Sequence, residues 1–359
     1  MRPAARVVAA AGLLLIVGAR CAREEPTGAT VVRGSALRAF PKESVALFVL
    51  EVTPLRGLAA FDRWVKEISS AAEQEGPLGV LEKRFGPEAF DRIERLGLAI
   101  VPQRGDRVGY AILADGPFGE QAMRERLGDQ EILTVLQIEG RPDFSVTVLE
   151  GGSLALGPRQ VLEEMRANAS RRNAGIDANT LILDLLRKVR PASEVWGAID
   201  YRTIAKLGRQ APWSAAPGSA ALKENPVASA LVALAFQGRI AGTPDLEVTG
   251  RADDEAGARK LADAARGLVA LGRMGVTQQQ AADWVAFLDG IRIEQKGEDV
   301  LLRAPVPPAL MSAMAEKARA AAAAMPARET VAPPAVPRPK GLSPPPKGLS
   351  PPPKSRRSP

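Results

Sequence analysis

The chain has 359 residues, with 48 Lys and Arg against 41 Asp and Glu, a single cysteine and no histidine. Without histidine there is no imidazole base that titrates near neutral pH, no histidine-assisted serine or cysteine nucleophile, and no zinc site of the usual composition. A single cysteine excludes a disulfide within the chain, so the fold must depend on its packed core. We therefore expect no catalytic residue, no metal site and no cofactor.

The N-terminal residues have the pattern of an export signal. Arg2 and Arg6 precede an almost wholly apolar run over residues 7–19, and polar residues begin at Arg20. A membrane-spanning helix needs about 20 apolar residues, which is more than this run provides, so a secretory signal is the better interpretation. Since no other stretch is long and apolar enough to span a bilayer, we expect the rest of the chain to be soluble.

Cys21 follows this run and resembles the lipidated cysteine of bacterial lipoproteins, in which Leu or Val and two small residues precede the Cys. The corresponding residues here are Gly18-Ala19-Arg20-Cys21, so Gly18 and Arg20 depart from the pattern. Two interpretations stay open: a lipid is attached to Cys21, or an ordinary signal is removed between Ala19 and Ala22. Both predict a cell-envelope protein, either anchored to a membrane or periplasmic.

The positive charge of the chain lies at its two ends. Residues 1–23 hold four basic residues and no acidic one, and residues 326–359 hold seven basic residues and one acidic one. Taking these from the totals leaves 37 basic and 40 acidic residues for 24–325, a balance of −3. The body therefore lacks the basic charge of a nucleic-acid-binding domain.

The C-terminal tail, residues 326–359, is rich in proline and contains a seven-residue repeat, Pro-Lys-Gly-Leu-Ser-Pro-Pro, over 339–345 and 346–352. Proline fixes φ and removes a donor, so we expect an extended, disordered segment without a core. The tail is either a solvated spacer or a cationic arm that contacts an anionic lipid or envelope polymer. The side chains that would make this contact are Lys340, Lys347, Lys354, Arg356 and Arg357.

Hydrophobic periodicity in the first half of the body predicts the order strand, helix, hairpin, helix, hairpin, helix. The predicted elements are a strand over 46–52, a helix with Leu58, Phe61, Val65, Ile68 and Ala72 on one face, strands 96–101 and 107–114, a helix from Asp115 to Leu127, strands 132–138, 144–150 and 153–156, and a helix from Pro158 that buries Val161, Leu162 and Met165.

The second half repeats this order, which indicates an ancient duplication. Its predicted elements are a strand over 194–200, a short helix over 201–208, strands 230–236 and 246–251, a long helix with the inner stripe Leu261, Ala264, Leu268 and Leu271, strands 291–294 and 300–303, and a last helix from Pro307 with Leu310, Met314, Ala318 and Ala321 inward.

Hairpins that alternate with helices predict an α+β fold, in which two similar halves have mostly antiparallel sheet and helices on one face. The expected segments are a signal (1–22), a linker (23–35), a first module (36–175), a bridging helix (176–190), a second module (191–325) and the tail (326–359). The start Phe40-Pro41-Lys42-Glu43-Ser44 before an apolar strand, together with the doubled plan, resembles uncharacterised exported bacterial proteins. That resemblance implies no activity.

Several short motifs have plain structural interpretations. Arg104-Gly105-Asp106 matches an adhesion tripeptide, but Gly-Asp also suits a hairpin turn, which we favour. Asp253-Asp254-Glu255 would cap a helix, Glu163-Glu164 would lie on a solvated helix face, and Gly151-Gly152 would form a turn. We expect three tryptophans in the core and one in a loop; these are Trp64, Trp196 and Trp284, and Trp213.

Three functions remain open on the sequence. The first is a non-catalytic binding or scaffolding role in the cell envelope. The second is a periplasmic carrier whose sheets and helices enclose a lipid or another apolar molecule. The third is a hydrolase that uses carboxylates alone, which would require two acidic side chains facing one cleft.

Overall fold

The computed structural model describes residues 27–58, 61–62, 85–86, 91–103, 107–128, 131–136, 144–190, 192–207, 230–275, 281–307 and 309–310. All of them belong to the unit Met1–Met311. Several predictions fall outside the described residues: Cys21, Trp64, the 104–106 turn, Trp213, most of the first and last predicted helices, and the whole tail.

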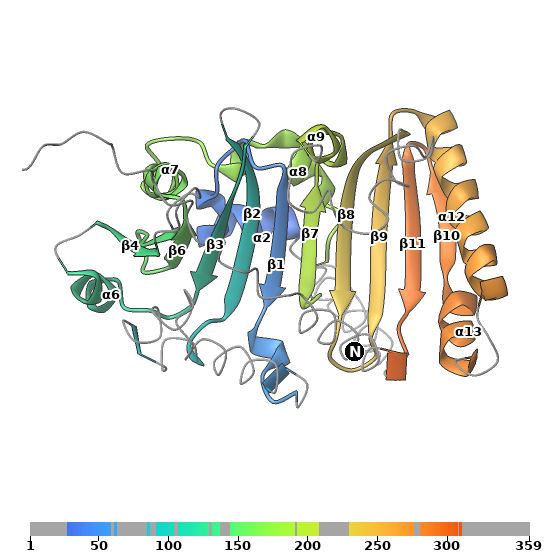
Figure 1. Ribbon diagram of the computed structural model, residues 1–359, viewed down its shortest axis with the longest axis horizontal. Coiled ribbons are helices and arrows are strands. Elements are labelled where there is room, and N and C mark those ends of the chain that lie inside the picture. Colours follow the sequence, from blue (N-terminus) through green and yellow to red (C-terminus); the bar gives the residue numbers. More distant parts are fainter. Residues whose placement is uncertain are drawn as a thin grey trace, which may run out of the picture. The chain divides into compact units, whose positions relative to one another are not determined.

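The described strands form one eleven-stranded sheet, in the order β10-β11-β9-β8-β7-β1-β2-β3-β6-β5-β4 (Figure 1). The strands are β1 (Ala46–Glu51), β2 (Arg95–Gln103), β3 (Arg107–Asp115), β4 (Ile132–Leu136), β5 (Phe144–Val148), β6 (Leu154–Gly157), β7 (Val195–Ile199), β8 (Leu231–Arg239), β9 (Asp245–Ala252), β10 (Arg292–Lys296) and β11 (Asp299–Pro305). Every neighbouring pair is antiparallel, so the predicted α+β class with antiparallel sheet is confirmed.

The two sequence halves meet in the middle of this sheet, because β1 pairs with β7 in the register Leu47↔Ala198. From β1 outward the order is β2, β3, β6, β5, β4, and from β7 outward it is β8, β9, β11, β10. Backbone hydrogen bonding therefore runs unbroken from one half into the other. The halves share one sheet, and residues of both belong to its largest core cluster.

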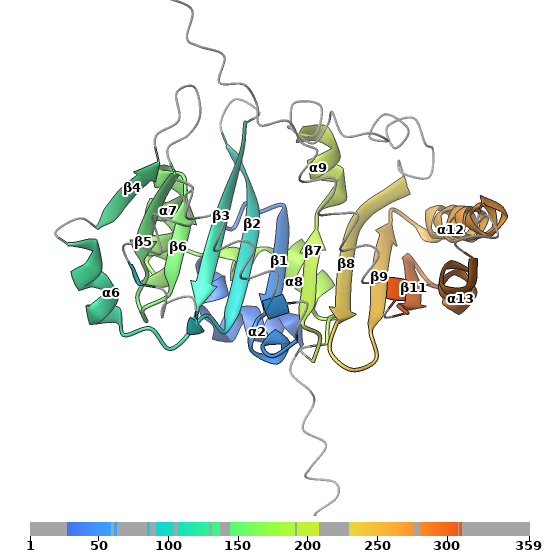
Figure 2. The ribbon, with the colours of Figure 1, turned by 60° about the horizontal axis from the view of Figure 1, so that its bottom comes forward.

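Helices pack on both faces of the sheet, and the expectation of helices on one face is wrong (Figure 2). The helical segments are α2 (Gly28–Gly34), η1 (Ala36–Ala39), η2 (Thr53–Leu55), α6 (Glu120–Leu127), α7 (Arg159–Ala169), η3 (Ile176–Ala178), α8 (Thr180–Leu186), α9 (Tyr201–Leu207), α12 (Glu255–Gly275) and α13 (Ala281–Gly290). Strands such as β1 are apolar at consecutive positions, so both of their faces favour burial.

The larger core lies on the face covered by α2, α7 and α8. Leu47 and Trp196 point to this face from the middle of the sheet, and both are fully buried. The opposite face carries a smaller cluster under α6, which includes Met123, and another under α12, which includes Ala262. Within the described residues, no helix is long and apolar enough to cross a membrane.

Part of the segment expected to be a linker, 23–35, forms helix α2. The Thr27 hydroxyl accepts from the backbone N–H of Thr30, and Val32 is fully buried. A Cβ on Gly28 would lie 3.0 Å from the carbonyl oxygen of Leu186, so glycine allows α2 to approach α8 closely.

The predicted bridging helix over residues 176–190 is divided into two shorter helices, η3 and α8.

The predicted inner stripe of α12 is confirmed at Leu261, which packs against the cluster on the sheet, and is wrong at Leu268 and Leu271. Leu268 is 65% exposed and Leu271 is 59% exposed, whereas Ala258 and Ala262 are fully buried against the sheet. Small side chains let the first turns of the helix approach the strands closely, so Ala258 and Ala262 pack inward with Leu261, whereas Leu268 and Leu271 further along point outward. Two other helices also differ: α6 begins at Glu120 rather than Asp115, and α13 was not predicted.

Candidate binding cavity

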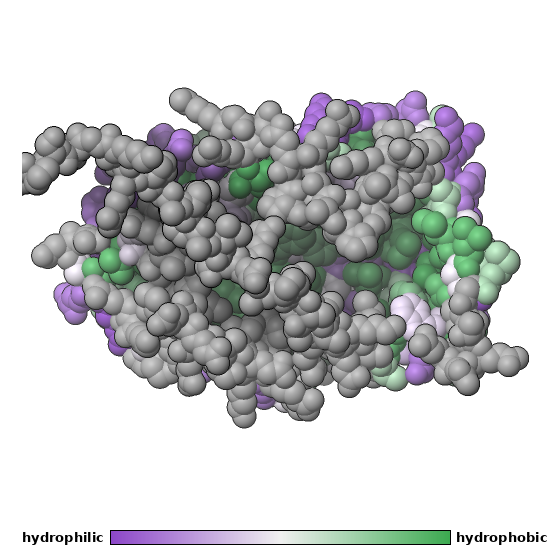
Figure 3. Space-filling model, in the orientation of Figure 1, coloured by the Kyte–Doolittle hydropathy of each residue, from purple (hydrophilic) through white to green (hydrophobic). Residues whose placement is uncertain are grey.

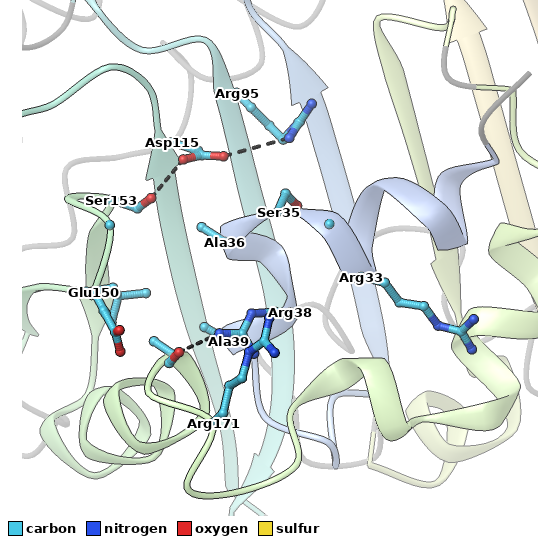
Figure 4. A pocket seen from close by; sticks show the side chains of 14 residues that line it. Arg33, Ser35, Ala36, Arg38, Ala39, Arg95, Asp115, Glu150, Ser153 and Arg171 are labelled. Carbon is cyan, nitrogen blue, oxygen red and sulfur yellow. Dashed lines mark hydrogen bonds and ion pairs between the residues drawn. The ribbon is translucent and has the colours of Figure 1, made fainter.

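A cavity of about 520 Å³ lies on the face covered by α2 and α7 (Figure 4). We call it the arginine cavity. Its walls come from α2 and η1, β2, the end of β3, the turn between β5 and β6, and the C-terminal end of α7. The charged residues that line it are Arg33, Arg38, Arg95, Arg171, Asp115 and Glu150. Four arginines and two acidic residues therefore line it, a balance that favours an anionic ligand, although the side chain of Arg33 points away from the other charged groups (Figure 4).

One end of the cavity is internally neutralised. The Nε of Arg95 lies 2.8 Å from Oε1 and 3.0 Å from Oε2 of Glu51, and its Nη1 lies 3.7 Å from Asp115. The Ser153 hydroxyl donates to Asp115 at 2.7 Å, and the indole N–H of Trp196 donates to Glu51 at 3.1 Å. These contacts tie β1, β2, β3, β7 and the turn before β6 together, so Arg95 has a structural role.

The opposite wall is held by contacts between η1 and the last turn of α7. Arg38 donates through Nη2 to the backbone carbonyl of Ala169, one of the carbonyls that the end of a helix leaves without an intrahelical partner. Asn168 is 1% exposed and donates through Nδ2 to the carbonyl of Ala39 at 3.1 Å. Arg38 is therefore anchored at one nitrogen, and its other N–H donors have no hydrogen-bond partner among the residues that the structure describes.

The end of α7 places Arg171 at the cavity. The backbone N–H of Arg171 donates to Asn168 and that of Arg172 donates to Ala167, both at 3.0 Å. This pair of bonds is the Schellman arrangement, which puts the residue after the cap in the left-handed region. Arg171 has a φ of 57°, and in Figure 4 its side chain points toward the part of the cavity that Arg38 faces.

Arg33 borders a second cavity of about 500 Å³, which is lined by residues of η3 and α8 together with Arg251. There Arg251 donates through Nη1 to Asp184 at 2.6 Å, and this hydrogen bond lowers the pKa of the Asp184 carboxyl. Burial alone would lower the pKa of Arg251, but the hydrogen bond to Asp184 and the charge of Asp299 raise it. Asp184 is thus paired with both Arg187 and Arg251 of this second cavity.

The two acidic clusters behave differently. Asp254 accepts from the backbone N–H of Gly257 at 2.6 Å, which confirms the predicted helix cap. Glu163 is exposed as expected, but Glu164 is half-buried. Burial, followed by the charge of neighbouring Glu43, raises the pKa of the Glu164 carboxyl.

The structure also describes two of the four tryptophans and the Gly151-Gly152 turn. Trp196 is fully buried, as predicted. Trp284, which was expected in the core, is only half-buried on α13, where it packs edge-on against Phe287 with ring centroids 6.0 Å apart. The predicted turn at Gly151-Gly152 is confirmed, since both glycines have positive φ, 91° and 95°.

Within the described residues, no group of three or more acidic or cysteine side chains is arranged to hold a metal ion.

Comparisons with known proteins identify only a distant structural resemblance. No protein-family model matches the sequence, and no curated protein does. Two crystal forms, I and IV, of the Treponema pallidum protein TP0453 are similar, with TM-scores of 0.42 and 0.40 and 10% sequence identity in each case. The alignments cover 79% of this chain and 97% and 95% of those chains.

Proposed function

We propose that this chain is an exported bacterial cell-envelope protein with a non-catalytic binding role, and that the arginine cavity receives an anionic ligand. The observation that carries the proposal is the excess of guanidinium groups over carboxylates in one concave site. Arg95 is paired with Glu51, whereas Arg33 and Arg171 have no ion pair with any residue that the structure describes. An anion would supply the missing partner.

The two ends of the sequence support a location at the envelope. Residues 1–22 have the composition of an export signal, and the tail carries widely spaced basic side chains. Each Lys or Arg close to an anionic lipid surface contributes about 1 kcal/mol to attraction. The tail would thus hold the body near anionic lipid or polymer. We also propose that the two halves arose by duplication, because each begins with three strands in consecutive order, β1-β2-β3 and β7-β8-β9, although the first half has six strands and the second has five.

The binding proposal is tested by thermal unfolding of the full chain in the presence of phenyl phosphate, citrate, neutral glycerol and a neutral monoacylglycerol. We expect the two anions to raise the melting temperature, because a ligand that binds only the folded state at a hundred times its Kd stabilises it by about 2.7 kcal/mol. Glycerol at the same concentration is the control. Equal melting temperatures with all four compounds would contradict the proposal.

A carrier of apolar molecules is the second candidate, and one observation favours it. Large apolar side chains remain exposed on α12, where Met274 is 77% exposed beside Leu271, and on β3, where Tyr110 is 47% exposed. Figure 3 shows hydrophobic residues at the surface over α12 and α13. In the thermal experiment, stabilisation by the monoacylglycerol but by neither anion would favour this second function.

Membrane attachment through Cys21 is tested separately, by replacing Cys21 with alanine and fractionating cells of the native host. We expect the variant to move from the membrane fraction to the soluble periplasmic fraction, because alanine has no thiol to acylate. Unchanged membrane association would contradict lipid attachment. Protein recovered from the cytoplasm with an intact N-terminus would contradict export itself.

A further inference from the structure

The conformation of Arg171 is unusual for its residue type. Among the described residues, Arg171 is the only non-glycine residue with a positive φ. The position after a Schellman cap is most often glycine, because a Cβ makes the left-handed conformation unfavourable for L-residues. The chain thus has arginine where local backbone energetics favour glycine. Residues held in such conformations are concentrated at binding and active sites.

The backbone bonds at the end of α7 determine where this arginine is aimed. The N–H groups of Arg171 and Arg172 are both fixed at 3.0 Å from helix carbonyls. Arg38 approaches the same region from η1 and is held by the carbonyl of Ala169, two residues before Arg171. Two guanidinium groups from segments far apart in sequence therefore face one part of the arginine cavity (Figure 4).

The carboxylates of the cavity do not neutralise this pair. Asp115 is engaged by Ser153 and Arg95. Glu150, the other carboxylate of the cavity, forms no ion pair with Arg38, Arg171 or any other described residue. Neither Arg38 nor Arg171 has an ion pair with any described residue. Two like charges that share a concave, partly apolar site repel each other unless an anion lies between them.

We propose that Arg38 and Arg171 together hold the phosphate group of a phosphate ester. This inference rests on the proposed function of the same site. Guanidinium forks match the oxygens of a phosphate group and can donate to it in pairs. A cavity of about 520 Å³ is much larger than a phosphate group alone and falls in the range of small-molecule sites. Ala36 of η1 is half-buried and lines the cavity beside Arg38, so it would contact the organic part of the ester.

The deciding experiment uses Arg171→Gly in the full-length protein, with Arg172→Gly as the matched control. Both variants remove one exposed arginine at adjacent positions, but only position 171 is left-handed.

We expect Arg171→Gly to bind phenyl phosphate at least about tenfold more weakly, since a hydrogen bond to a charged group is lost. The same variant should melt no lower than the wild type, because glycine suits the left-handed position. Arg172→Gly should bind within about twofold of the wild type, because its side chain does not line the cavity.

Calorimetric titrations with phenyl phosphate and with dihexanoyl phosphatidic acid distinguish a soluble ester from a lipid headgroup as the source of the phosphate. Arg171→Lys, which keeps the charge but not the fork, should bind with intermediate affinity. Equal losses in Arg171→Gly and Arg172→Gly would overturn the inference, and so would unchanged affinity in Arg171→Gly. Either result leaves the proposed function intact as long as the wild type binds, whereas a wild type that binds no anion refutes the proposed function itself.

Discussion

Replacement of Trp196 by alanine should lower the free energy of unfolding by about 3–5 kcal/mol, the usual cost of truncating a buried aromatic side chain. Trp196 lies on β7, which pairs with β1 and β8, and its side chain is fully buried in the larger core. Its loss would leave a cavity between the sheet and the helices that cover it. The measurement is denaturant unfolding monitored by circular dichroism.

A second substitution at this position separates packing from hydrogen bonding. Trp196→Phe keeps most of the apolar volume but removes the N–H that donates to Glu51 at 3.1 Å. Since Glu51 keeps its contact with Arg95, we expect a smaller loss than for alanine, on the order of 1–2 kcal/mol. Trp284→Ala is the control, because that side chain is only half-buried. A Trp196→Ala protein as stable as Trp284→Ala would contradict the central position of Trp196.

Replacement of Gly175 by alanine should destabilise the protein by about 1–3 kcal/mol, as overpacking of a tight contact does, and should weaken anion binding. A Cβ at this position would lie 1.8 Å from the carbonyl oxygen of Arg38 and 3.0 Å from that of Phe40. Both obstacles are backbone atoms, so η1 would have to move. Because Arg38 belongs to η1, the guanidinium group that faces the cavity would move with it.

Gly267→Ala is the matched control for Gly175→Ala. Gly267 lies inside α12, and a Cβ there meets nothing within 4 Å. Alanine in a helix interior is favoured over glycine by about 0.5–1 kcal/mol, so this variant should melt slightly higher than the wild type. Unfolding and phosphate binding are measured for both variants. A Gly175→Ala protein that matches Gly267→Ala in stability and affinity would contradict the close approach of η1 and η3.

Local patterns were sufficient to predict most strands and their hairpins. The hairpin of β10 and β11 turns at Gly297, which has a φ of 59°, and both strands lie close to their predicted ranges. Alternation along a strand and glycine at a turn are properties of a few consecutive residues. For this reason they can be recognised without knowledge of the rest of the chain.

The orientation of α12 could not be predicted in the same way. Periodicity selects the face with the largest apolar residues, here the face with Leu268 and Leu271, but both are exposed. The inward face contains Ala258 and Ala262 because close contact with the sheet requires small side chains. The choice between these faces depends on the distance between helix and sheet, which is a tertiary property.

The arginine cavity could not be predicted either. Arg38, Arg95 and Arg171 come from a short 3-10 helix, a strand and a helix end, and no spacing in the sequence relates them. The only local sign was two consecutive arginines after α7, and basic residues are common at helix ends. What unites the three is the set of contacts between η1, β2 and the end of α7.

Residue types and short patterns were enough to establish the absence of histidine, the separation of the charged ends from a nearly neutral body, and the order of most strands and helices. Those features follow from residue types and from short-range periodicity. The pairing of β1 with β7 in one sheet, the helices on both faces, and the cavity shared by Arg38 and Arg171 depend on contacts between distant parts of the chain. The physical reason is that alternation along a strand specifies which side chains share a face but not which strand lies alongside.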